Sequence, residues 1–90
     1  QKLPPFINSI KEIGVGLHSL TSTSNEYYLE TTSGGRIIIN KKDDLKTVVQ
    51  NLESFLKDHA IISTPNFFEN VSYIDLRFGN KVFYKLKSEI

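Results

Sequence analysis

The sequence predicts a single small α+β domain, residues 1–90, in which a mostly antiparallel sheet of about five strands is covered by one amphipathic helix. A short helix is predicted at the N-terminus. Two stretches, residues 26–40 and 71–87, show the period-two alternation of β-hairpins. Between them, residues 44–58 repeat apolar side chains with helical spacing. A chain of 90 residues can bury one hydrophobic core.

The composition of the chain disfavours several classes of function. Eleven basic and ten acidic residues give a formal net charge of +1, which does not favour nucleic acid or an anionic membrane surface. Without cysteine, the chain has no disulfide, thiolate nucleophile or zinc finger. The two histidines, His18 and His59, have no acidic cluster at ligand spacing, so we expect neither a metal nor a cofactor.

The first residue is Gln1 and the sequence contains no methionine. We therefore expect a fragment of a longer protein or a processed product. No apolar run approaches the roughly 18 residues of a membrane span, and no signal peptide is recognisable. Any membrane anchor of the parent protein is expected outside this piece.

The N-terminal helix is predicted near residues 5–13. Pro5 is tolerated in a first helical turn, and Gly14 is suited to end the helix. The apolar face of this helix would comprise Leu3, Phe6, Ile7, Ile10 and Ile13.

A three-stranded meander is predicted next, from residues 15–22, 26–32 and 36–40. A three-residue loop, Ser33-Gly34-Gly35, brings the apolar faces of the last two strands together, with Gly35 left-handed. The expected pairs are Thr31 with Ile37 and Leu29 with Ile39.

The clearest helix in the sequence follows, capped by Asp43 or Asp44. Glu53 and Lys57 add an exposed i, i+4 pair of minor value. The apolar positions of the helix are Leu45, Val48, Val49, Leu52, Phe55 and Leu56. The next segment, 60–70, is predicted to be irregular and broken at Pro65, and to be pinned to the body by Ile61, Ile62, Phe67 and Phe68.

The last hairpin, residues 71–87, is the most informative stretch. A two-residue loop would place Val82 opposite Arg77, so the alternation favours a three-residue loop, Gly79-Asn80-Lys81. The expected core face is Ile74, Leu76, Phe78, Val82, Tyr84 and Leu86. The expected pairs are Phe78 with Val82, Leu76 with Tyr84 and Ile74 with Leu86 on that face, and Arg77 with Phe83 and Asp75 with Lys85 on the other.

The polar face of this hairpin leaves several roles open. Asp75 and Arg77 lie two apart on one face, which favours a structural ion pair over a catalytic role. Phe83 either covers Arg77 or receives a side chain from a partner. The lysines of the last strand either guard the edge against aggregation or recruit a partner, and the two roles can coexist. They are Lys81, Lys85 and Lys87.

The segment Tyr73-Ile74-Asp75-Leu76-Arg77-Phe78 resembles a known family signature. In that signature an apolar residue, Asp, Leu, Arg and an aromatic precede the last hairpin of the extracytoplasmic β domain of the bacterial cell-division protein FtsQ, called DivIB in Gram-positive bacteria. The order of parts is also similar: a strand, glycine turn and apolar strand in residues 27–40, and a leucine-rich helix in residues 44–58. The resemblance covers about residues 15–87. The chain lacks the transmembrane helix and POTRA domain that precede this domain in the family, and its segment before Val15 is short.

The resemblance implies a non-enzymatic divisome scaffold of a membrane-anchored protein, on the extracytoplasmic side of the membrane at the septum. It implies that the domain binds FtsB/DivIC and FtsL by β-augmentation at its last strand and helps regulate septal cell-wall synthesis. No nucleic acid or small-molecule substrate is implied. By position, Arg77 and Phe78 match the family's interface pair. The final strand is carried over as a segment, which gives Lys81, Val82, Phe83, Tyr84 and Lys85 as further partner-binding candidates.

Two other classes compete with this interpretation. Cations interleaved with Tyr73 and Phe83 are the pattern of a nucleic-acid surface, although the net charge of +1 counts against it. These cations are Arg77, Lys81, Lys85 and Lys87. A small hydrolase is the weakest candidate, because no nucleophile, base and orienting group can be assembled from the residues present.

Overall fold

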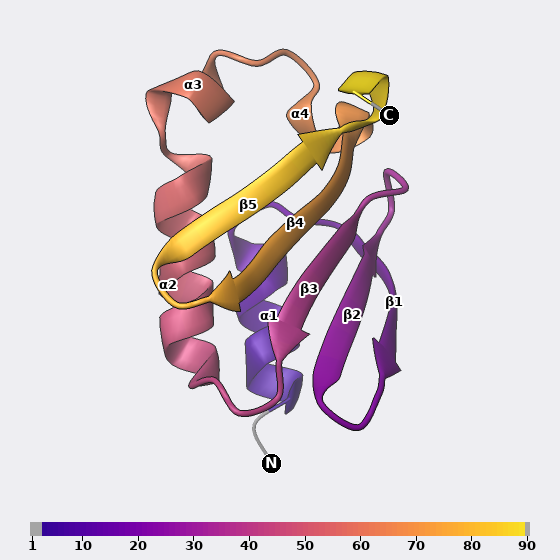
Figure 1. Cartoon of the computed structure of the whole chain (residues 1–90), viewed down its shortest axis with the longest axis vertical. Coiled ribbons are helices and arrows are strands. Elements are labelled where there is room, and N and C mark those ends of the chain that lie inside the picture. Colours follow the sequence, from indigo (N-terminus) through magenta and orange to yellow (C-terminus); the bar gives the residue numbers. More distant parts are fainter. Residues whose placement is uncertain (1–2, 90) are drawn as a thin grey trace.

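One layer of the molecule is a five-stranded mixed sheet, and helices cover one face of it (Figure 1). The computed structural model describes residues 3–89. The strands are β1 Leu17–Ser22, β2 Glu26–Thr31, β3 Arg36–Asn40, β4 Val71–Phe78 and β5 Lys81–Leu86. The helices are α1 Leu3–Glu12, α2 Leu45–Leu56, the single-turn helices α3 His59–Ile62 and α4 Phe67–Asn70, and a terminal 3-10 turn, Lys87–Glu89.

The strands follow one another across the sheet in the order β1-β2-β3-β4-β5. Neighbours are antiparallel except β3 and β4, which run parallel because α2 connects them. The predicted fold class is thereby confirmed, including the short N-terminal helix and the longer helix. The strand order, which the sequence alone leaves open, makes β1 and β5 the two edges.

Helix α1 covers the sheet beside α2, on the same face (Figure 1). Phe6 and Ile10 point into the core and are almost completely buried. The helix ends where predicted, since Gly14 takes a positive φ of 96° and its N–H donates to the carbonyl of Lys11 over 3.0 Å. Val15 is buried directly after this turn.

The hairpin of β2 and β3 has a different register from the predicted one. Leu29 pairs with Ile37 and Tyr27 with Ile39, which is a shift of two residues. The loop is residues 32–34, and its left-handed residue is Gly34 (φ 94°) rather than Gly35. Gly35 instead lies in the ladder, where an added Cβ would come within 3.0 Å of the Val71 carbonyl oxygen. A two-residue shift keeps each side chain on its face, so the core residues were still predicted correctly.

Helix α2 begins at the predicted cap. Asp44 Oδ2 accepts hydrogen bonds from the backbone N–H of Thr47 over 3.3 Å and from its hydroxyl over 2.9 Å. Val48 and Leu52 are buried against the sheet, and the other four apolar positions are partly buried at its margin. The Glu53–Lys57 pair forms at 3.8 Å and is largely exposed, so its contribution to stability is small.

The segment between α2 and β4 contains two helical turns around Pro65, where only irregular chain was predicted. Ile61 and Phe67 are buried and Phe68 is partly buried, which confirms that these residues pin the segment to the body. The prediction is wrong for Ile62, which is 66% exposed. A single turn of α3 can direct only one of two consecutive side chains to the core.

The hairpin of β4 and β5 also differs from the prediction. Its loop has two residues, Gly79 and Asn80, and Phe78 pairs with Lys81. The next regular pair is Asp75 with Phe83, so two β4 residues, Leu76 and Arg77, stand opposite Val82 alone. This β-bulge supplies the extra residue that we assigned to the loop. The predicted cross-strand pairs of this hairpin are therefore wrong.

The bulge also changes which side chains reach the core. Ile74 and Leu76 are buried as predicted, but Phe78 and Tyr84 are 51% and 41% exposed. Tyr84 still lies on the helix-covered side, where its ring contacts those of Phe55 and Phe67. Phe78 has left the core face because it follows the bulge. Val82 and Leu86 are only partly buried.

Candidate protein-interaction edge

Strand β5 is an edge of the sheet, and β4 is its one neighbouring strand within residues 3–89. The partner-binding residues suggested by the sequence lie on this strand and on the end of β4. An edge strand presents one row of backbone N–H and C=O groups to its surroundings, which is what an added strand requires. Figure 1 shows β5 on the side of β4 away from β3; it runs diagonally in front of α2, from the tip of the hairpin toward the C-terminus.

Two exposed aromatic side chains lie beside this edge. Phe78 and Phe83, which we call the aromatic pair, are each 51% exposed. Their rings meet edge to face, with centroids 5.2 Å apart and an interplanar angle of 89°. Phe83 thus contacts Phe78 instead of covering Arg77. About half of the surface of each residue is therefore available for contact with another molecule.

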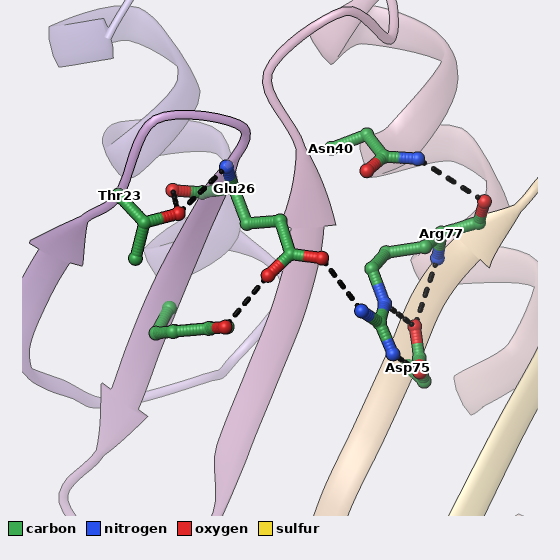
Figure 2. A network of polar contacts seen from close by, with 6 residues as sticks. Thr23, Glu26, Asn40, Asp75 and Arg77 are labelled. Carbon is green, nitrogen blue, oxygen red and sulfur yellow. Dashed lines mark hydrogen bonds and ion pairs between the residues drawn. The ribbon is translucent and has the colours of Figure 1, made fainter.

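Arg77 is bound by two carboxylates on the sheet face opposite the helices, which we call the open face (Figure 2). Its Nε and Nη2 donate to Asp75 Oδ1 and Oδ2 over 2.8 and 2.6 Å, and its Nη1 donates to Glu26 Oε2 over 2.6 Å. The predicted structural ion pair of Asp75 and Arg77 is confirmed. Together, Glu26, Asp75 and Arg77 form what we call the acid–arginine network.

Polar groups from β2, from β3 and from the turn between β1 and β2 hold this network in position. The second oxygen of Glu26 accepts a hydrogen bond from the Tyr28 hydroxyl over 2.6 Å. The Glu26 backbone N–H donates to Thr23 Oγ1 over 3.0 Å. The Asn40 amide donates to the Arg77 carbonyl over 3.3 Å. Arg77 is therefore connected to β2 and β3 as well as to its own strand (Figure 2).

The network favours the charged forms of Arg77 and Glu26. The hydrogen bonds that Arg77 donates to Asp75 and then to Glu26 raise the pKa of Arg77 above its ordinary value. Hydrogen bonds from Tyr28 and then Arg77 lower the pKa of Glu26, and the same bond to Glu26 raises the pKa of Tyr28. At neutral pH the arginine is thus charged and faces two acidic side chains. Such an arrangement links β4 to β2 through charge-assisted hydrogen bonds.

A second ion pair lies on the same face and provides a comparison. Arg36 Nε contacts Glu30 Oε2 over 2.7 Å, and the Arg36 guanidinium lies 4.8 Å from the centre of the Tyr28 ring. This pair joins β2 to β3, as the register of Glu30 with Arg36 requires. It belongs to the same face as the acid–arginine network but is not in contact with the aromatic pair.

The tip of the last hairpin and the end of β5 are both anchored to the body. The Asn51 amide of α2 donates to the Gly79 carbonyl over 3.0 Å. Lys87 Nζ donates to the carbonyls of Ser33 and Glu69 over 3.2 and 3.0 Å. The edge strand is thus held at both ends, which lowers the conformational entropy lost when a partner binds.

The same contacts weaken the nucleic-acid hypothesis. Of the four cations that suggest it, Arg77 is bound to carboxylates and Lys87 donates to carbonyl oxygens. Lys81 is exposed on β5 and Lys85 is partly buried there. Phosphate binding would then depend on two lysines in a chain of net charge +1, which is a small electrostatic attraction.

Sequence reasoning found part of this site. Arg77, Phe78 and Phe83 were singled out, and they lie together at the edge. Glu26 was missed because it is separated from Arg77 by 51 residues, and no spacing rule connects them. Only the parallel pairing of β3 with β4 brings the two hairpins into one sheet.

Within residues 3–89, no group of three or more His, Cys, Asp or Glu side chains could hold a metal ion. In the same part of the chain, no helix is both long and apolar enough to cross a membrane. No protein-family model and no curated protein sequence matches the chain.

Proposed function

We propose that this chain is a non-enzymatic scaffold domain of the bacterial division complex, similar to the β domain of FtsQ/DivIB. It binds FtsB/DivIC, together with FtsL, by adding a strand of the partner to β5. The observation that carries the proposal is an edge strand with an exposed aromatic pair beside it. The identity of the partners rests on the resemblance of residues 73–78 to the family signature.

The chemistry of the edge supports strand addition. Backbone hydrogen bonds along the six residues of β5 would supply affinity without depending on the partner's side chains. The aromatic pair would add an apolar contact at one end of the strand, where burial of a single aromatic ring is commonly worth about 2 kcal/mol. Both contributions come from a strand whose ends are anchored.

The candidate residues then divide by role. Phe78 and Phe83 present side chains to the partner. Val82 and Tyr84 contribute mainly backbone, since Tyr84 packs toward Phe55 and Val82 is partly buried. Lys81 and Lys85 lie within β5 and give it positive charge, which disfavours pairing with a second copy of β5. Arg77 supports the edge from within the sheet.

The proposed location follows from the proposed partners. The domain belongs to a longer, membrane-anchored protein and lies on the extracytoplasmic side of the membrane, at the division septum. There its binding of FtsB/DivIC and FtsL helps regulate septal cell-wall synthesis.

Calorimetry with the extracytoplasmic segments of the cognate FtsB/DivIC and FtsL tests the proposal. Amide chemical shifts recorded with the labelled chain should change along residues 78–86 and remain unchanged along residues 17–22. Absence of binding, both by this chain and by the whole extracytoplasmic region of its parent, would reject the proposal. Shift changes confined to β1 would place the contact at the wrong edge. Steeply salt-dependent binding of an oligonucleotide would favour the nucleic-acid alternative.

A further inference from the structure

We infer that Glu26 on β2 is a positioning residue for the β5 edge, acting through Arg77 and Phe78 on the aromatic pair. Its consequence for partner binding rests on the proposed function. Glu26 lies on an interior strand, and β3 and β4 separate it from β5. Three strand spacings amount to roughly 14 Å, so a strand added beyond β5 would not reach Glu26.

Carboxylates from two strands hold the Arg77 guanidinium. All three guanidinium nitrogens of Arg77 donate to carboxylate oxygens, two to Asp75 and one to Glu26. Asp75 belongs to the same strand and moves with it. Glu26 is the contact that fixes the guanidinium relative to the rest of the sheet, because β2 is not part of the last hairpin.

Ring contacts connect Arg77 to the edge strand β5. The Arg77 guanidinium carbon lies 5.6 Å from the centre of the Phe78 ring, within the range of a cation–π contact. The Phe78 ring in turn meets the Phe83 ring at 5.2 Å. A continuous series of contacts thus runs from Glu26 on β2 to Phe83 on β5.

The backbone alone does not fix the position of Phe78 relative to Arg77. Arg77 lies in the β-bulge, where the ladder between β4 and β5 is interrupted. Its N–H donates to Asp75 Oδ1 over 3.1 Å, and its carbonyl accepts from the Asn40 amide over 3.3 Å (Figure 2). Side-chain groups thus bind both backbone polar groups of Arg77, so the direction of the next residue, Phe78, depends on them.

Glu26 is itself well suited to act as a fixed point. Its backbone N–H is held by Thr23, and one carboxylate oxygen is held by the Tyr28 hydroxyl. Only the other oxygen turns to Arg77. Because Glu26 has few conformations left to lose, its contact with Arg77 transmits position as well as charge.

The variant Glu26→Gln tests the inference, and Glu30→Gln is its matched control. Both changes remove one carboxylate from β2 on the open face, but the partner of Glu30 is Arg36, which is not in contact with the aromatic pair. The first readout needs no partner protein. Ring proton shifts of Phe78 and Phe83 should change in Glu26→Gln and stay at their wild-type values in Glu30→Gln.

The second readout is affinity for the extracytoplasmic segment of FtsB/DivIC. Glu26→Gln should weaken binding about 3- to 10-fold, a typical size for coupling through a series of contacts, and Glu30→Gln less than about 2-fold. In a Phe78→Ala background, Glu26→Gln should have no further effect on affinity, since the group through which it acts is gone. A general loss of stability would instead lower affinity in both backgrounds.

Circular dichroism verifies that each variant is folded, and Glu26→Asp serves as the second variant if Glu26→Gln does not fold. Equal ring shifts in the Glu26 and Glu30 variants would overturn the inference. An undiminished loss of affinity in the Phe78→Ala background would overturn it too. If neither the wild-type chain nor the whole extracytoplasmic region of its parent binds while the ring shifts still distinguish the two variants, the proposed function is rejected and the connection from Glu26 to the aromatic pair stands.

Discussion

The two edge strands of the sheet occupy equivalent positions but differ in their charged and exposed aromatic side chains. Both β1 and β5 are six residues long, and each has one neighbouring strand within residues 3–89. Strand β1 carries no Lys, Arg, Asp or Glu, and its one large exposed apolar side chain is Leu20. Strand β5 carries two lysines and exposes Phe83 and Tyr84. Only β5 thus combines charges that discourage self-pairing with an aromatic anchor for a partner.

The edges also differ in what supports them. Strand β1 contains a bulge between Leu17 and Ser19, and all its side chains after Leu17 are exposed. Strand β5 lies against β4, whose Ile74 and Leu76 are buried in the core. The acid–arginine network and Asn51 tie this side of the sheet to β2, β3 and α2. The comparison teaches that an edge suited to binding needs an exposed anchor on a rigid support, and that exposure alone is insufficient.

The largest expected effect tests this difference in support. Ile74→Ala removes a side chain that is 1% exposed and should lower the free energy of unfolding by about 2 to 4 kcal/mol. Leu20→Ala on β1 should lower it by less than about 1 kcal/mol, because Leu20 is already partly in water. Urea denaturation of the two variants measures both values. Similar losses would contradict the claim that β5 rests on a better-packed support than β1.

The second effect concerns the anchor. Phe83→Ala should weaken binding of the FtsB/DivIC segment by about 2 kcal/mol, roughly 30-fold, because the aromatic pair loses one of its two rings. Leu20→Ala should change affinity less than about 2-fold and so serves as the control at the opposite edge. Calorimetry provides the comparison. A loss of affinity in the β1 variant, with wild-type affinity in Phe83→Ala, would move the binding site to the other edge.

The sequence predicted the elements of both edges, since each element depends on local patterns. Helical spacing, the cap at Asp44 and the turn at Gly14 are properties of a few consecutive residues, and all three were predicted correctly. The registers of both hairpins were wrong. In the β2–β3 hairpin the two-residue shift keeps each side chain on its face. In the last hairpin a two-residue loop with a bulge places most side chains on the same faces as a three-residue loop without one, so alternation distinguishes the registers in neither hairpin.

The residues of the site also fall into two groups, those that a local sequence pattern identifies and those that it does not. Phe78 and Phe83 were found because they belong to one hairpin, although Phe78 was also assigned to the core, which is wrong. Glu26 and Asn51 reach this hairpin from distant segments. Their contribution depends on strand order and on the parallel pairing of β3 with β4, which no local pattern encodes.

A smaller effect is expected on amide hydrogen exchange, which should respond to different variants in the turns of the two edge hairpins. Asn51→Ala removes the hydrogen bond to the Gly79 carbonyl and should cost about 1 kcal/mol. Amide hydrogen exchange should then accelerate at residues 79–81 and remain unchanged at residues 22–25. Thr23→Ala is the matched change at the β1–β2 turn, where Thr23 Oγ1 accepts from the Glu26 N–H. Its effect on exchange should be confined to that turn and β2, and overlap of the two patterns would show that the edges are not independently anchored.

The smallest effect is the pH dependence of the network that supports β5. Glu26 has a pKa below its ordinary value of 4.5, chiefly because of its hydrogen bonds with Tyr28 and Arg77, while burial and the charge of Asp75 oppose the shift. The folded chain therefore binds this proton less tightly than the unfolded chain, and the ionised carboxylate stabilises the fold. That contribution is fully present above pH 4.5 and is lost as the pH falls through the lowered pKa of the folded state. The urea midpoints of wild type and Glu26→Gln should thus differ at pH 7 and converge on acidification. A difference that persists below the folded-state pKa would mean that the carboxylate charge is not what Glu26 contributes.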